Sequence, residues 1–94
     1  MIRTTVIISL HNRERKPISN YAMVYRLPAE QTVRYAIQNV EKYLGTQLPK
    51  DYDPKSVAQC KRYQRLVTSD NKLGQQVIVT IDFLQTTDIS GEKQ

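Results

Sequence analysis

Residues 28–45, PAEQTVRYAIQNVEKYLG, determine the fold that we expect for this chain of 94 residues. Their apolar side chains recur at intervals of three and four, which places them on one face of a helix. These side chains are Val33, Ala36, Ile37, Val40, Tyr43 and Leu44. Pro28 suits the first turn of a helix, and Gly45 suits the residue that ends one with a positive φ. We therefore predict an amphipathic helix over residues 28–44, whose apolar face must pack on another layer.

Alternating runs on both sides of this helix supply that layer. Residues 2–10 alternate in polarity, residues 19–27 do so again after a charged loop, and residues 76–84 form a third run rich in Val and Ile. A period of two with β-branched residues is typical of strands. Ile7 makes the second face of the first run apolar as well, which predicts a central strand. The first two runs, joined by a short polar loop, predict an antiparallel hairpin.

The stretch at residues 54–66 fits two structures. Asp53 followed by Pro54 is typical of a helix start. One helical face would then carry Val57, Cys60, Tyr63, Gln64 and Val67. We therefore expect a second amphipathic helix over about 54–66. The alternative is a strand over residues 63–67 that forms a hairpin with the last run.

Together these elements predict a small α+β domain of two layers in the order β-β-α-α-β. A mixed three-stranded sheet would have the first helix packed across one face, with the last strand parallel to the first through a right-handed crossover. The arrangement is similar in element order to the β-grasp layout, and β-β-α-β-β is the alternative order. We expect one domain over residues 1–85 and a polar, flexible tail over 86–94.

Composition argues against catalysis and against a bound cofactor or metal. The chain has one His, one Cys and three Gly, so neither a Cys/His zinc site nor a glycine-rich nucleotide loop fits. We expect Cys60 to be a buried thiol on the second helix and His11 to face solvent from the loop. Asp51 and Asp53 do not have calcium-loop spacing. The sequence therefore predicts a binding protein that is not an enzyme.

Positive charge gives the main indication of what is bound. The formal net charge is +5. We predict one basic cluster on the loop after the first strand and another along the outer face of the second helix. The clusters comprise Arg13, Arg15 and Lys16, and Lys55, Lys61, Arg62 and Arg65. Tyr35, on the polar side of the first helix, and Tyr52, in a loop, are the tyrosines that we expect to make contacts with a ligand. The other four, Tyr21, Tyr25, Tyr43 and Tyr63, should pack in the core or an interface.

These clusters predict a module that contacts a polyanion, with nucleic-acid phosphates as the first choice and low base specificity. The alternative is a protein-interaction module, an adaptor or inhibitor such as an accessory protein of a mobile element, that docks on an acidic partner. Self-association through sheet edges is compatible with both. No signal peptide or membrane span is visible, so we expect a cytoplasmic protein without membrane contact.

Overall fold

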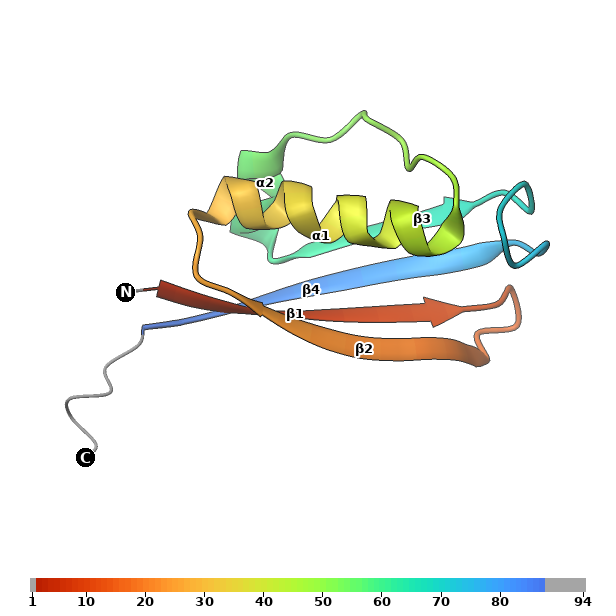
Figure 1. Cartoon of the computed structure of the whole chain (residues 1–94), viewed down its shortest axis with the longest axis horizontal. Helices are drawn as coiled ribbons and strands as arrows, with labels where there is room; N and C mark the ends of the chain where they lie inside the picture. Colours follow the sequence, from red (N-terminus) through yellow and green to blue (C-terminus); the bar gives the residue numbers. More distant parts are fainter. Residues whose placement is uncertain (1, 88–94) are drawn as a thin grey trace.

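Two strands, two helices and two further strands follow one another in the computed structural model, which describes residues 2–87 (Figure 1). The elements are β1 (Ile2–His11), β2 (Pro17–Tyr25), α1 (Ala29–Leu44), α2 (Pro54–Cys60), β3 (Arg62–Val67) and β4 (Val77–Thr87). The predicted α+β class is confirmed. β4 continues past the predicted strand end at residue 84 and past the predicted domain boundary at 85, and the rest of the predicted tail, 88–94, lies outside the described residues.

The four strands form one antiparallel sheet in the order β2-β1-β4-β3. Ile8 of β1 lies opposite Tyr21 of β2 on one side and Ile81 of β4 on the other. The predicted hairpin and the central place of β1 are therefore confirmed. The predicted three-stranded mixed sheet is wrong, and so is the β-grasp-like parallel pairing, because β4 runs antiparallel to β1 and has β3 on its other side.

The stretch at 54–66 divides into a helix and a strand. α2 begins at the predicted cap, where Asp53 Oδ1 accepts a hydrogen bond from the Lys55 N–H at 3.2 Å. It ends after seven residues at Cys60 and is capped by Lys61, whose φ of 62° is left-handed. The predicted long helix is therefore wrong, and the alternative strand at 63–67 is correct. β3 satisfies backbone groups that the outer edge of β4 would otherwise leave unpaired.

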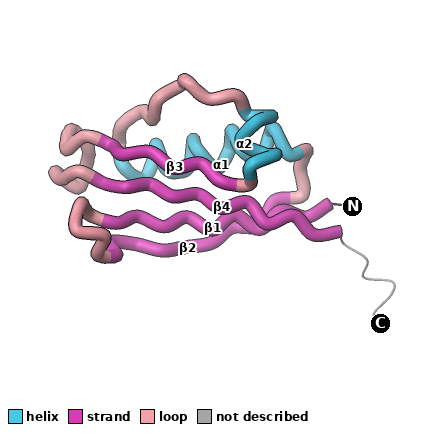
Figure 2. The backbone as a smooth tube through the Cα atoms, turned by 180° about the vertical axis from the view of Figure 1, so that it is seen from behind, coloured by secondary structure: helices cyan, strands magenta, loops and turns pink. Residues whose placement is uncertain are grey.

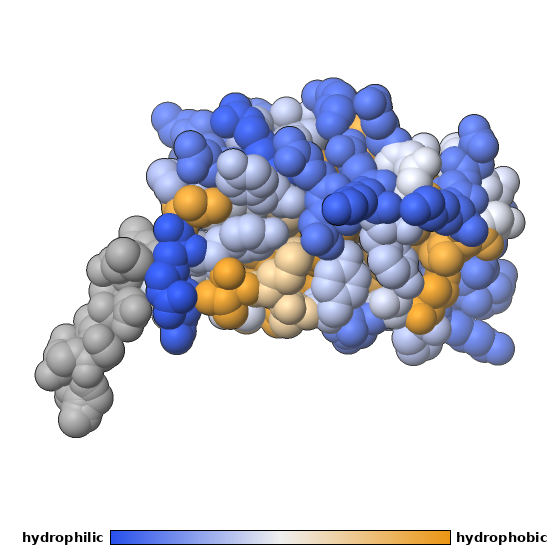
Figure 3. Space-filling view, viewed as in Figure 1, coloured by the Kyte–Doolittle hydropathy of each residue, from blue (hydrophilic) through white to orange (hydrophobic). Residues whose placement is uncertain are grey.

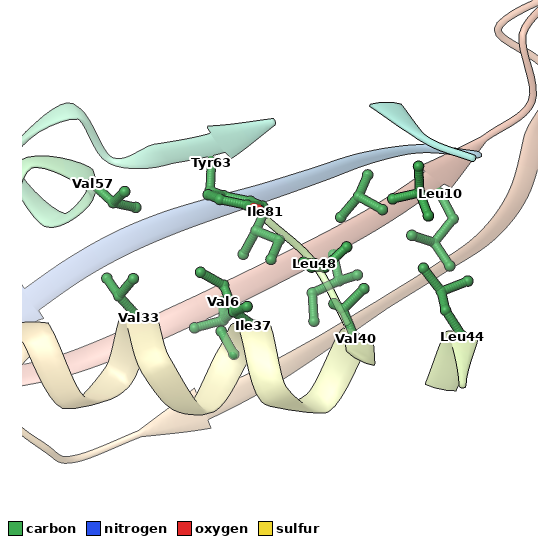
Figure 4. Close-up of a cluster of buried hydrophobic side chains, with 14 of the residues drawn as sticks. Val6, Leu10, Val33, Ile37, Val40, Leu44, Leu48, Val57, Tyr63 and Ile81 are labelled. Atoms are coloured by element: carbon green, nitrogen blue, oxygen red, sulfur yellow. The ribbon is translucent and has the colours of Figure 1, made fainter. Parts of the chain in front are cut away.

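The core lies between the sheet and the two helices (Figure 4). Ile37 of α1, Val6 of β1 and Ile81 of β4 are completely buried, and Figure 4 shows their side chains pointing into the same layer. Gly45 ends α1 with a φ of 69°, as predicted, and its N–H donates to the Glu41 carbonyl at 2.8 Å.

Behind this core, no element of residues 2–87 covers the opposite face of the sheet, which we call the uncovered face. Figure 2 shows β1, β2 and β4 from this side with no helix in front of them. Three large apolar side chains are about half exposed there or at its edges: Val24 at 53%, Leu66 at 56% and Leu84 at 49%. Antiparallel sheets commonly leave one face to solvent, and the paired Arg62 and Asp82 lie on this uncovered face.

Candidate anion-binding groove

Two adjoining hollows lie on the uncovered face of the sheet, at the end where β1 turns into β2. Their volumes are about 300 and 320 Å³, and both are lined by Arg15, Gln64 and Ile78. The first is also lined by Ser9, His11, Arg62, Thr80 and Asp82. The second is also lined by Arg13, Arg65 and Leu66. We call the two hollows together the arginine groove.

Strand register brings the floor of the groove together. Ser9 of β1 lies opposite Thr80 of β4, which lies opposite Gln64 of β3. Two residues further along the same strands, Arg62 lies opposite Asp82. Because side chains two apart in a strand share a face, these polar groups converge on the uncovered side of the sheet.

The wall of the groove is the loop between β1 and β2. The Asn12 carbonyl accepts from the Arg15 N–H at 2.9 Å, and the Asn12 side chain accepts from the Lys16 N–H at 2.9 Å. Arg15 has a φ of 65°, in the left-handed region. Glycine adopts this region readily, whereas another residue is destabilised there by about 1–2 kcal/mol. The chain therefore keeps an arginine where the backbone alone favours glycine, and such strain is concentrated at functional positions.

Carboxylates partly neutralise two of the four arginines. Arg62 Nε donates to Asp82 Oδ1 at 2.7 Å. Arg65 lies over the ring of Tyr63, 4.8 Å from its centroid, and its Nη2 donates to Asp51 Oδ1 at 3.3 Å. These contacts hold Arg65 at the edge of β3 in a packing role. Because Arg62 uses Nε for this bond, its two terminal nitrogens remain as donors that could bind a ligand.

The loop arginines are less constrained. Arg13 and Arg15 are exposed, and neither forms an ion pair with another residue of the 2–87 range. Asp82 is the one carboxylate among the described residues that line the groove. Positive charge therefore predominates, and an anion entering the groove meets Arg13, Arg15 and Arg62.

The predicted second basic cluster is divided. Arg62 and Arg65 would lie near each other on a helix, but residues three apart in a strand point to opposite faces. Lys55 and Lys61 line a separate hollow of about 310 Å³ together with Glu30 of α1. The single stripe along a long helix is therefore wrong. Lys16 is exposed in the loop beside the groove but does not line it.

Neither predicted contact tyrosine reaches the groove. Tyr52 packs edge-on against Tyr63, with ring centroids 5.5 Å apart. Tyr35 lies on α1 and stacks on Tyr25, with centroids 6.4 Å apart. Tyr43, predicted to be packed, is 42% exposed. The described residues that line the groove include no Tyr, Phe or Trp, and His11 is the one ring among them, so they provide no row of rings on which successive bases could stack.

Two further residues lie where the sequence did not place them. Cys60 is exposed, because α2 ends at this residue and does not continue over the core. His11 is the last residue of β1 and lines the groove, whereas we predicted a solvent-facing loop residue. The alternation of the first strand, carried one residue further, would have placed His11 on the same face as Ser9.

Neither a metal site nor a known relative identifies the function. Within residues 2–87 no three His, Cys, Asp or Glu side chains gather as metal ligands, and no helix has the length and apolar character to cross a membrane. No family model matches the chain, and no curated protein or solved structure matches it either.

Proposed function

We propose that this protein binds the phosphate backbone of nucleic acids in the arginine groove, without catalysis and with low base specificity. The observation that supports this function is the convergence of Arg13, Arg15 and Arg62 on one open face. A guanidinium group presents a planar fork of donors that matches two phosphate oxygens. Three such groups from two separate segments suit an extended row of phosphates better than a single small anion.

The neutral groups of the groove fit the same ligand. Gln64 Nε2 donates one of its two hydrogens to Thr80 Oγ1 at 2.9 Å, which leaves its second hydrogen and the Thr80 hydroxyl proton as donors to a ligand. Hydroxyl and amide groups of this kind bond to sugar and phosphate oxygens, and such contacts position a chain without reading its bases. Low base specificity follows from these contacts and from the lack of Tyr, Phe and Trp rings among the described lining residues.

The number of arginines sets the expected salt dependence. Three neutralised phosphates give a slope of about −2 in log affinity against log salt for a single strand. Affinity should therefore fall about 20-fold between 50 and 200 mM salt. If diffuse surface charge alone attracted nucleic acid, a variant that lacks two of these arginines would keep most of this salt dependence.

The test compares two double variants with equal charge changes. Arg13→Glu with Arg15→Glu removes two groove cations. Lys55→Glu with Lys61→Glu makes the same change in the separate hollow, and each pair contains one residue of left-handed φ. Fluorescence anisotropy with a labelled single-stranded oligonucleotide of mixed sequence, and with its duplex, measures binding. Circular dichroism confirms that each variant is folded.

We expect the groove variant to lose at least 10-fold more affinity than the control variant. Equal losses would mean that only total charge matters and would contradict the proposed site. The absence of wild-type binding at low salt would contradict the proposed ligand. Co-purification of an acidic protein that survives nuclease treatment would support the alternative function.

A further inference from the structure

β2 forms one edge of the sheet and has no charged residue in its nine positions, PISNYAMVY. Exposed strand edges usually carry charges or are short, which prevents pairing with other chains. The other edge follows this pattern, because β3 has six residues and includes Arg62 and Arg65. The β2 edge lacks this protection.

The backbone of β2 also presents free hydrogen-bonding groups outward. The Phe83 N–H donates to the Lys61 carbonyl, so the odd-numbered residues of β4 bond toward β3 and the even-numbered ones toward β1. The even-numbered residues of β4 pair with odd-numbered residues of β1, so the even-numbered residues of β1 bond toward β2. Those even-numbered residues pair with odd-numbered residues of β2, which therefore bond toward β1. The residues that direct their N–H and C=O groups outward are Ile18, Asn20, Ala22 and Val24.

A row of uncharged side chains flanks this edge on the helix side. The Tyr21 and Tyr43 rings lie 6.0 Å apart, and the Tyr21 hydroxyl donates to Asn39 Oδ1 at 2.9 Å. Tyr25 and Tyr35 form the next ring pair along the edge. Figure 3 shows pale and orange side chains along the lower part of this face, below the blue side chains that cover α1. We call these five residues the tyrosine flank.

We propose that two copies of this chain pair antiparallel along β2 and form one continuous eight-stranded sheet. The register that uses all nine residues places Tyr21 opposite itself at the two-fold axis. It also places Ile18 opposite Val24 of the second copy, and Asn20 opposite Ala22. All four of these residues direct their backbone groups outward, so the register forms a regular ladder. Val24, which is 53% exposed in the single chain, gains an apolar neighbour.

The distribution of charge favours a second copy as the occupant of this edge. The chain has a net charge of +5, yet neither β2 nor the tyrosine flank carries a charged side chain. Like-charged copies repel least where they meet through an uncharged surface. Lys16 and Arg26 flank β2 at its two ends, and an acidic ligand would find no cation between them along the strand.

The size of the edge predicts a weak dimer. β2 is about 30 Å long, and the molecule measures 20 Å along its shortest axis. Each copy would bury about 600 Å², so the total of about 1,200 Å² lies at the lower end of stable interfaces. The dimer should therefore dissociate on dilution.

Two lysine variants with matched exposure test the edge. Val24→Lys adds a charge at the β2 edge, where the side chain is 53% exposed. Leu84→Lys adds the same charge at 49% exposure on the same face, but on β4. Both side chains neighbour Thr5 across the sheet. Sedimentation velocity between about 5 and 500 µM should show a dimer for the wild type and Leu84→Lys, and a monomer for Val24→Lys.

Ala22→Pro tests the backbone pairing itself. It removes an outward N–H that does not bond to β1, so the fold should survive, as circular dichroism would show. We expect this variant to be monomeric. A dimer that persists in both β2 variants would overturn the proposal, and so would a wild type that stays monomeric at every concentration. Dissociation of Leu84→Lys alone would show that the uncovered faces pair instead. None of these outcomes depends on the arginine groove.

Discussion

Arg15 combines a left-handed backbone with a place in the arginine groove, so Arg15→Gly should stabilise the protein while it weakens binding. Relief of the left-handed strain contributes about 1–2 kcal/mol. The greater freedom of glycine in the unfolded chain offsets about 0.5–1 kcal/mol of this gain. A net gain of about 0.5–1 kcal/mol should raise the Tm of a domain of this size by about 2–8 °C.

The same substitution removes one of three phosphate contacts. The slope of log affinity against log salt should therefore change from about −2 to about −1.4. Thermal unfolding followed by circular dichroism measures the first effect, and anisotropy titrations at several salt concentrations measure the second.

Lys61→Gly is the matched control, because Lys61 has nearly the same φ of 62° and lies outside the groove. It should gain similar stability and keep the wild-type salt slope. A lower Tm in Arg15→Gly would refute the reasoning from strain. A higher Tm with unchanged binding would refute the role of Arg15 in the groove.

Three further changes probe the groove and the core. Asp82→Asn removes the carboxylate that forms an ion pair with Arg62. Oligonucleotide affinity should therefore rise several-fold in the same anisotropy assay, because this carboxylate no longer competes for Arg62. An unchanged affinity would argue against phosphate contact by Arg62. Burial raises the pKa of Tyr63 to about 12, so the folded protein keeps this proton where the unfolded chain loses it. The free energy of unfolding should therefore fall between about pH 10 and pH 12 by up to about 2–3 kcal/mol. Urea unfolding should show a smaller fall over this pH range in Tyr63→Phe than in the wild type. An equal fall in the two proteins would contradict the raised pKa of Tyr63. Ile37→Asp places a charge at a fully buried position and should abolish the native circular dichroism spectrum, because domains are typically stable by only about 5–15 kcal/mol. A native spectrum would contradict the place of Ile37 in the core.

The N-terminal half of the fold could be predicted because each run there fits one period only. Residues 28–44 fit a helix and no strand, and the structure has α1 over Ala29–Leu44. Residues 2–10 fit a period of two, with Ile7 as the apolar residue of the second face, and the structure has a strand there that extends one residue further. In both segments, the apolar pattern agrees with the local backbone preference.

The second half could not be predicted in the same way. Val57, Tyr63 and Val67 fit a helical face, while Tyr63 and Val67 also fit a strand. The choice depends on Lys61, which adopts a left-handed φ that lysine rarely takes. One additional strand also reverses the chain once more before β4. The predicted parallel pairing of β4 with β1 is therefore wrong, because the prediction did not include β3.

The candidate site was predicted in part. Arg13, Arg15 and Arg62 were selected by charge, and the structure brings them to one groove. Ser9 and Thr80 were not selected, because their meeting depends on a register between strands 71 residues apart in the sequence. Charge is visible along a sequence, whereas a cross-strand pair of neutral side chains is not.

The ladder between β1 and β4 joins the beginning of the described chain to its end, with Ile2 opposite Thr87. During synthesis on a ribosome, β1 must therefore wait for β2, both helices and β3 to be made before its second neighbour, β4, emerges. Contacts this distant in sequence slow folding, since a long loop must close before they form. A circularly permuted gene that joined these two strands by a short linker would make the slowest contact of the native chain a local hairpin.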